Sequence, residues 1–210
     1  MKKTTRPILL APAAPLTTTR LFLRPIRQSD LADLHALRTQ IEVMKWTSTG
    51  EIDADREVTQ VWMNRFLPPN DAITFNYAVE ELTSPGKVIG VLGCHILDPP
   101  ELGYMFRKES WGKGYAFEAL QRWLQAWWAL PRREVVIESE DSTSTSTFAS
   151  DADSVVSEPE VLRARTDAEN AASARLLGKC GFRLIGEGMT DVRGRGILQK
   201  TITLELEQPQ

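Results

Sequence analysis

A glycine-rich turn flanked by cations is the segment of the chain best suited to chemistry. Residues 107–116 read Arg-Lys-Glu-Ser-Trp-Gly-Lys-Gly-Tyr-Ala. The hydrophobic pattern predicts a strand over 101–107 and a helix over 113–128, so the turn lies at a helix N-terminus. Such an end attracts anions through its free N–H groups and dipole, and glycine lets a phosphate approach the backbone. With Lys108 and Lys113 adding positive charge, the segment predicts a pyrophosphate site.

Two families that use such a turn do not fit these residues. A Walker loop needs Gly-x4-Gly-Lys-Ser/Thr, a string that the sequence lacks. A dinucleotide fingerprint needs Gly-x-Gly-x-x-Gly, but Phe117 stands at the third glycine after Gly112 and Gly114. The strands before the turn also look antiparallel, which does not suit a dinucleotide fold. A plain glycine-rich helix start without a ligand is the structural alternative.

The third kind of turn matches better. The segment resembles the acyl-CoA-binding motif of the Gcn5-related N-acetyltransferases (GNAT), Gln/Arg-x-x-Gly-x-Gly/Ala. Gly114 and Ala116 match this pattern, and Trp111 stands where Gln or Arg is usual. The longer string over 102–120 looks like the ribosomal-protein-acetylating, RimJ/RimL-like branch, in which Trp is common at this position.

A second stretch, residues 170–182, carries the same resemblance. It is similar to the Asn-x-x-Ser…Leu-x-x-x-Gly-Phe element of that branch, whose Asn and Ser contact the pantetheine and phosphate end of CoA. The resemblance implies that Asn170 bonds the pantetheine arm and Ser173 a nearby polar group, although a helix cap would also explain Asn170. Residues 18–30 look like the opening strand and turn of the branch. The resemblance thus covers about 17–207, apart from an acidic insertion.

The fold and the co-substrate follow from the resemblance. An α+β domain is expected, with a mixed, V-split central sheet of about seven strands flanked by four helices. Acetyl-CoA is the expected co-substrate, and no metal is expected. The residues implied to contact it are Met105, Phe106, Arg107, Trp111, Gly112, Lys113, Gly114, Tyr115, Ala116, Asn170 and Ser173.

The resemblance also implies a route for acetyl transfer. The amine attacks the thioester carbonyl directly, and the backbone N–H groups of about Tyr104–Phe106 polarise that carbonyl, which places Tyr104 in the expected catalytic set. Glu101 is the best candidate for the general base, with His95 as an alternative, although an exposed acid at a strand start would look the same. Leu177 occupies the position where many relatives carry a general-acid Tyr. The leaving thiolate is therefore expected to take its proton from solvent.

The acceptor pocket is expected to have aromatic walls. Trp46, Trp62 and Phe66 lie on the two-helix excursion that forms one wall of the acceptor site in relatives, and His95 completes the predicted pocket. Aromatic residues at helical spacing would equally fit a core. The implied activity is acyl-CoA-dependent N-acetyl transfer to a protein or peptide N-terminus or to a small amine. The alternative is a non-catalytic acyl-CoA-binding sensor or regulatory module.

The elements that must position these residues follow from hydrophobic periodicity. Helix caps are expected at Ser29 or Asp30 and at Asp53 or Asp55. An antiparallel meander of three strands follows, and the later elements alternate strand and helix. The expected strands are 19–25, 73–79, 87–97, 101–107, 160–166, 182–187 and 197–207, and the expected helices are about 30–41, 53–66, 113–128 and 170–180.

Composition bounds the organisation and the partners. The chain has 210 residues and a formal net charge of -3, which suits one domain and does not indicate a nucleic-acid binder. Residues 1–16 are expected to be a flexible arm, 17–207 a single domain, and the acidic Ser/Thr-rich stretch 138–160 a disordered insertion. No apolar run approaches a membrane span. Cys94 and Cys180 form no motif, which favours an intracellular, cytoplasmic protein, as a monomer or homodimer.

Overall fold

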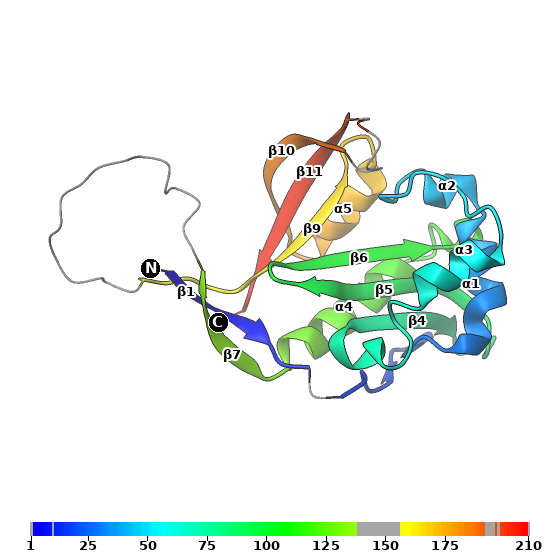
Figure 1. Ribbon diagram of the computed structural model, residues 1–210, viewed down its shortest axis with the longest axis horizontal. Helices are drawn as coiled ribbons and strands as arrows, with labels where there is room; N and C mark the ends of the chain where they lie inside the picture. The colour runs from blue at the N-terminus through cyan, green and yellow to red at the C-terminus, as the bar shows by residue number, and fades with distance from the viewer. Residues whose placement is uncertain (1, 10, 138–155, 192–195, 197, 210) are drawn as a thin grey trace, which may run out of the picture.

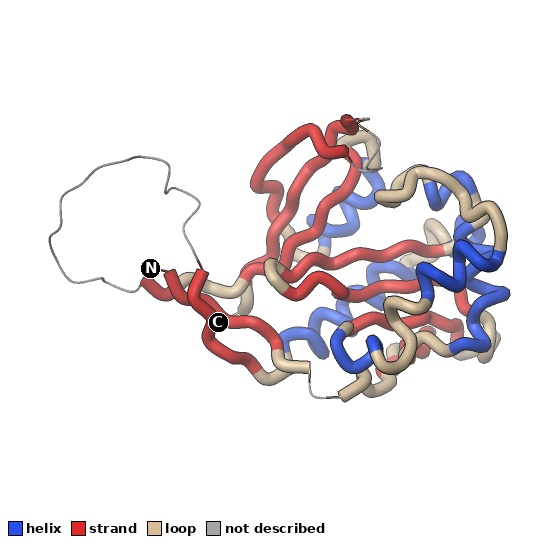
Figure 2. The backbone as a smooth tube through the Cα atoms, viewed as in Figure 1, coloured by secondary structure: helices blue, strands red, loops and turns tan. Residues whose placement is uncertain are grey.

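A computed structural model describes most of the chain. The described residues are 2–9, 11–137, 156–191, 196 and 198–209. They form a large twisted sheet with helices on both faces and a small second sheet beside it (Figures 1 and 2). Within the described ranges, no helix is long and apolar enough to cross a bilayer.

The large sheet has eight strands in the order β10-β11-β9-β6-β5-β4-β3-β2, one more than the sequence suggests. Neighbouring strands are antiparallel except β6 and β9, so the expected meander of β4, β5 and β6 is confirmed. The strands are β2 (Leu16–Thr17), β3 (Leu21–Arg24), β4 (Phe75–Glu81), β5 (Val88–Leu97), β6 (Pro100–Phe106), β9 (Val161–Asp167), β10 (Arg183–Asp191) and β11 (Leu198–Glu207).

The sheet splits between its two parallel strands. The ladder of β6 and β9 has two pairs of residues, Glu101 with Arg163 and Leu102 with Ala164. Beyond these pairs the strands diverge, which gives the V shape visible between β6 and β9 in Figure 1. The split that the resemblance implies is therefore present.

The described residues contain five α-helices, against four expected. The additional helix is α2, which begins where the expected first helix was to end, after Gln40 in an extended conformation (φ -85°, ψ 109°). Asp55 caps α3 by accepting the Val58 N–H at 2.9 Å, which confirms one of the two caps expected there. The helices are α1 (Leu31–Arg38), α2 (Ile41–Met44), α3 (Arg56–Met63), α4 (Tyr115–Trp128) and α5 (Ala171–Lys179), with 3₁₀ turns η1 (Gln28–Asp30), η2 (Asn70–Ile73) and η3 (Lys108–Ser110).

Each face of the sheet has its own apolar core. On one face, α4 stacks Trp123 on Trp127 with ring centroids 5.1 Å apart, and the Trp123 indole donates to the Phe75 carbonyl at 3.1 Å. Helix α5 packs into the same cluster. On the other face, Leu34 of α1 and Met63 of α3 pack against β4 and β5. The helices thereby hold both arms of the split sheet.

The N-terminal segment corrects the expectation of a flexible arm over 1–16. Residues Lys2–Pro7 form strand β1, which pairs with β7 (Arg132–Ile137) and β8 (Val156–Ser157) in a three-stranded sheet. Backbone pairing with β7 and β8 orders this strand. It contains no apolar run, so nothing in the sequence indicated it. The expected acidic insertion at 138–160 lies mostly outside the described residues, but its last part is ordered.

Glu160 fixes the small sheet to the domain. Its side chain is fully buried and ion-paired with Arg132, at 2.8 Å from the guanidinium Nε. The Thr5 hydroxyl donates to the same carboxylate at 2.8 Å. A buried carboxylate needs such partners, so β1 belongs to the folded unit.

Replacing Thr5 with Val tests this docking. The substitution keeps the shape of the side chain but removes a donor from buried Glu160, so the free energy of unfolding should fall by about 1–3 kcal/mol. Urea unfolding measures the change. Thr19→Val, at an exposed position, is the matched control. Equal stability of the two variants would contradict the docking of β1.

Candidate active site

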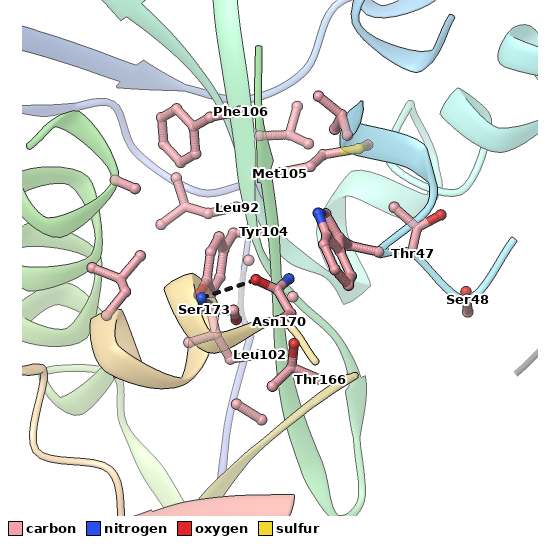
Figure 3. Close-up of a pocket in the computed structure, with 18 of the residues that line it drawn as sticks. Thr47, Ser48, Leu92, Leu102, Tyr104, Met105, Phe106, Thr166, Asn170 and Ser173 are labelled. Carbon is pink, nitrogen blue, oxygen red and sulfur yellow. Dashed lines mark hydrogen bonds between the residues drawn. The ribbon is translucent and has the colours of Figure 1, made fainter. Parts of the chain in front are cut away.

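One cavity of about 1330 Å³ contains most of the residues singled out by the sequence. It opens where β6 and β9 part, with α5 on one side and the segment after α2 on the other (Figure 3). The predicted site residues that line it are Glu101, Tyr104, Met105, Phe106, Trp111, Gly112, Gly114, Tyr115, Ala116, Asn170, Ser173, Trp46, Trp62 and His95. Residues from distant parts of the sequence therefore meet in one place.

Strand β6 presents free backbone groups to this cavity. The Arg107 N–H donates to the Ile89 carbonyl of β5 at 2.9 Å. Because successive residues of a strand direct their backbone groups to opposite sides, the even-numbered residues of β6 face β9. Leu102 is paired there, whereas Tyr104 and Phe106 lie beyond the point where β9 departs. Their N–H groups can therefore bind a ligand, which narrows the expected range Tyr104–Phe106 to two residues.

The two faces of β6 divide the cavity. The side chains of Tyr104 and Phe106 pack with the α4 and α5 core, whereas Met105 packs with the α1 and α3 cluster. Alternation places Glu101 and Gly103 on the Met105 face. A Cβ added to Gly103 would meet no atom within 4 Å. Open space therefore lies beside Glu101 on this face.

The glycine-rich turn lies at the start of α4, as predicted. Gly112 and Gly114 have φ of +72° and +79°, a region that residues with a side chain rarely adopt. Gly114 is the N-cap of the 14-residue helix α4, and the Glu118 N–H is the first to bond back to its carbonyl. The preceding N–H groups and the helix dipole thus remain available to an anion.

Arg20 holds this turn and was missed by the sequence analysis. Its guanidinium donates to the Lys113 carbonyl at 3.0 Å and to Glu118 at 2.6 Å, and it lies 4.7 Å from the centre of the Tyr115 ring. The available signal was the opening strand, where Arg20 falls within the family-like stretch 18–30. Its distance in sequence from the turn concealed the contact.

Three residues in the segment 107–116 make contacts within the protein. The Trp111 indole N–H donates to the Phe106 carbonyl at 2.8 Å and so closes the turn. Arg107 is buried; it donates to the Val88 carbonyl and to Asp33, both at 2.8 Å. Neither Arg107 nor Lys113 lines the cavity. The Arg107 side chain ties β6 to α1, and the Lys113 carbonyl accepts a hydrogen bond from Arg20. That either residue contacts acetyl-CoA stays a prediction.

Helix α5 supplies the opposite wall. The Asn170 side chain caps it by accepting the Ser173 N–H at 3.1 Å (Figure 3). The hydroxyls of Tyr104 and Ser173 are hydrogen-bonded at 2.7 Å. Burial raises the pKa of Tyr104 to about 12, although the Ser173 contact opposes this shift. Leu177, at the position where many relatives carry a general-acid Tyr, is buried in the same apolar cluster against which Tyr104 packs.

Glu101 and His95 face each other across a strand irregularity. Between Cys94 and Ile96 the register of β5 shifts by one residue, which leaves His95 as a bulge opposite Glu101. Partial desolvation and the positive charge of Arg65 lower the pKa of His95, while Glu101 opposes this effect. The Glu101 carboxylate accepts from the Arg165 guanidinium at 2.8 Å. The two candidate bases therefore lie close together.

The segment between α2 and α3, together with α3, forms the wall of the cavity that the sequence analysis expected to face the acceptor. Arg38 binds Asp53 through two hydrogen bonds of 2.6 and 2.8 Å, and its guanidinium lies 4.4 Å from the centre of the Trp62 ring. Trp62 and Phe66 contact edge to face at 5.0 Å. Trp46 also lines the cavity, whereas Phe66 is buried and so serves both wall and core. The described residues hold no cluster of His, Cys, Asp and Glu able to bind a metal ion.

Comparisons with known proteins agree with this geometry. A family model described as the acetyltransferase (GNAT) domain matches residues 20–183. The uncharacterized N-acetyltransferase p20 of Bacillus licheniformis is 30% identical over 139 residues, which cover 61% of this chain and 76% of that protein.

Solved structures share the fold at lower identity. The spermidine N-acetyltransferase of Vibrio cholerae, in complex with CoA and spermine, superposes with a TM-score of 0.64 at 17% identity, covering 91% of this chain and 97% of that one. RimL, a ribosomal L7/L12 alpha-N-protein acetyltransferase in complex with CoA, gives 0.64 at 14% identity, covering 92% and 98%. These likenesses confirm the expected fold class, while the two names give different acceptors.

Replacing Gly114 with Asp tests the turn. A carboxylate at the positive end of α4 would repel phosphates, and φ of +79° strains the new residue. We expect CoA binding to weaken by at least about 30-fold, or ~2 kcal/mol. Isothermal titration calorimetry with CoA measures the effect.

Two further variants isolate its cause. Gly86→Asp is the matched control, because Gly86 has φ of +86°, open space around its Cβ position and no place in the cavity. Gly114→Asn separates charge from strain, because it places an uncharged side chain of the same size in the same backbone conformation. If Gly114→Asp binds CoA as well as the wild type, the turn is not the phosphate site.

Proposed function

Because the chain belongs to the acetyltransferase (GNAT) domain family, we propose that it transfers the acetyl group of acetyl-CoA to a primary amine of a peptide N-terminus or a small molecule. The observation that carries this proposal is the unpaired edge of β6. The free N–H groups of Tyr104 and Phe106 run directly into the glycine-rich turn, within the same cavity. That arrangement fits a long ligand with a polar arm and a pyrophosphate.

Different residues along this edge would bind different parts of acetyl-CoA. The turn and the start of α4 bind phosphate oxygens, and Asn170 and Ser173 lie beside the pantetheine arm. The N–H groups of Tyr104 and Phe106 can donate to a carbonyl oxygen and to the negative charge that develops on it. Acetyl-CoA supplies the activated acetyl group. The amine then approaches from the Met105 face, where Gly103 leaves room.

Glu101 is proposed as the base on that face. An α-amino group has a pKa of about 7.7–8.0 and needs little help to become neutral, whereas a lysine amine near 10.4 needs more. Glu101 can accept the proton of the attacking amine directly or through a water molecule. His95 stands beside it with a lowered pKa and can share this role.

Replacing Glu101 with Gln should lower kcat by about 100-fold or more while CoA affinity stays unchanged, because general-base help is worth about 10²–10⁴. Thiol release from acetyl-CoA in the presence of an amine measures kcat. Glu205→Gln is the matched control, since Glu205 also pairs with an arginine of β9, Arg163, but lies outside the cavity. If Glu101→Gln retains turnover and His95→Asn loses it, His95 and not Glu101 is the base.

Tyr104 is proposed to stabilise the leaving thiolate. With a pKa of about 12 its hydroxyl stays protonated at neutral pH and can donate a hydrogen bond. A hydrogen bond to a charged group is worth about 1.5–3 kcal/mol, so Tyr104→Phe should lower kcat by about 10–100-fold.

The measurement is kcat at saturating acetyl-CoA. Tyr77→Phe removes a different buried hydroxyl, which donates to the Ala14 carbonyl at 3.2 Å outside the cavity, and should leave kcat within about twofold. An unchanged kcat in Tyr104→Phe would show that Tyr104 does not stabilise the thiolate, which would then take its proton from solvent.

A non-catalytic acyl-CoA-binding module is the second candidate. Two observations favour it: Leu177 replaces the usual general acid, and Arg165 engages Glu101. Such a module would bind CoA with the affinity of an enzyme but release no thiol with any amine. Within the enzymatic proposal, Trp111 and the residues around it favour the RimJ/RimL-like branch, whose preference is for N-terminal amines.

A further inference from the structure

The acceptor side of the cavity carries a positive charge that no described acidic residue balances. Two of the cations on this side are paired, Arg38 with Asp53 and Arg165 with Glu101. Arg65 lines the same side. Within the described residues, no ion pair and no side-chain hydrogen bond engages its guanidinium. An exposed cation at a cavity wall is available to a ligand.

The other unpaired cations of the cavity lie elsewhere. Arg175 and Lys179 belong to α5, which packs on the Tyr104 face of the sheet (Figure 1). That face carries the polar groups assigned to CoA. Arg65 lies two residues after the end of α3, on the face that carries Met105. Its charge is therefore directed at the acceptor rather than at CoA.

Arg65 also lies close to the place where an amine would react. Its chain neighbour Phe66 packs edge to face against His95, with ring centroids 5.9 Å apart. Burial lowers the pKa of His95, and the positive charge of Arg65 adds to this effect. Glu101 stands opposite this histidine. An amine at Glu101 would therefore lie in the same part of the cavity as the Arg65 guanidinium.

The entrance beside Arg65 is apolar. Val58, Val61 and Trp62 of α3 line it, and the two valines are 43% and 67% exposed. Exposed apolar side chains at a cavity mouth favour a ligand that covers them. An acceptor composed entirely of charged and polar groups would leave these apolar side chains exposed to water.

We infer that the acceptor is a primary amine with an apolar body and an anionic group near its nitrogen, and that Arg65 binds this anion. The inference rests on the proposed acetyl transfer. A carboxylate or a phosphate has the required chemistry, as in a free amino acid, a peptide that begins with an acidic residue, or an aminoalkyl phosphate. A polyamine, which carries cations instead, would be repelled by Arg65.

Matched acceptors provide the test. Thiol release is measured with saturating acetyl-CoA for phenylalanine against phenylalaninamide, for peptides that begin with Glu against Gln, and for phosphoethanolamine against ethanolamine, with spermidine as the polycation. We expect the anionic member of at least one pair to have a kcat/KM about 10-fold or more above its neutral partner, because a guanidinium–anion hydrogen bond is charge-assisted. The pair that responds identifies the source of the anion.

Arg65→Gln assigns the preference to this residue. The ratio of kcat/KM within a responding pair should fall towards one, and comparing that ratio between wild type and variant cancels differences in the basicity of the amines. Arg65→Glu should favour spermidine. Arg56→Gln is the control, because Arg56 is an exposed arginine at the start of the same helix and does not line the cavity.

Two results would overturn the inference while leaving acetyl transfer intact. One is a wild-type preference for neutral amines or spermidine across the panel. The other is an unchanged ratio in Arg65→Gln. Absence of thiol release with every amine, by a protein that binds CoA, would contradict the proposed function itself and with it this inference.

Discussion

The structure depends on the short ladder between β6 and β9. If the ladder continued, the Tyr104 and Phe106 backbone groups would be satisfied by β9 and the cavity would not exist. A buried N–H without a partner costs free energy comparable to a lost hydrogen bond, so this edge must meet water or a ligand. A ligand that replaces the missing strand recovers that cost. The sheet therefore contributes a binding edge as well as a scaffold.

Keeping two strands apart requires that both arms be held from outside. Helix α5 holds β9, and the buried ion pair of Arg38 and Asp53 holds the α2–α3 segment over the other arm. Arg107 joins β6 to α1 through Val88 and Asp33. Breaking a buried pair by removing one partner costs about 3–5 kcal/mol, so such contacts keep the wall in place.

The local elements were predictable and the long-range contacts were not. The strand before the turn, the turn itself and the α4 helix follow from periodicity and glycine placement, and Asn170 appears as a helix cap. The pairing of β1, by contrast, depends on partners more than a hundred residues away. Backbone pairing leaves no pattern in a short polar strand, so the sequence indicated a flexible arm there.

The directions of the long side chains were unpredictable for the same reason. Arg107 and Lys113 stand within the motif, but the fold directs Arg107 into the core and leaves Lys113 outside the cavity. Arg20 lies outside the motif yet bonds to its backbone. A motif fixes the path of the backbone, because glycine conformations and helix caps are local. Which long side chain reaches the ligand depends on neighbours that arrive from elsewhere in the chain.

Because the thiolate leaves readily, catalysis of the proposed reaction depends mainly on activating the amine. A thiol of pKa about 8.5 leaves as a thiolate without prior protonation. A tyrosine with a pKa of about 12 can stabilise that thiolate by donation but is a weak proton donor. In the proposed reaction the attacking amine must then lose its proton with help from the base, and amines of lower pKa need less of that help. The positive field of Arg65 acts in the same direction, because it disfavours an ammonium and favours a neutral nitrogen beside His95.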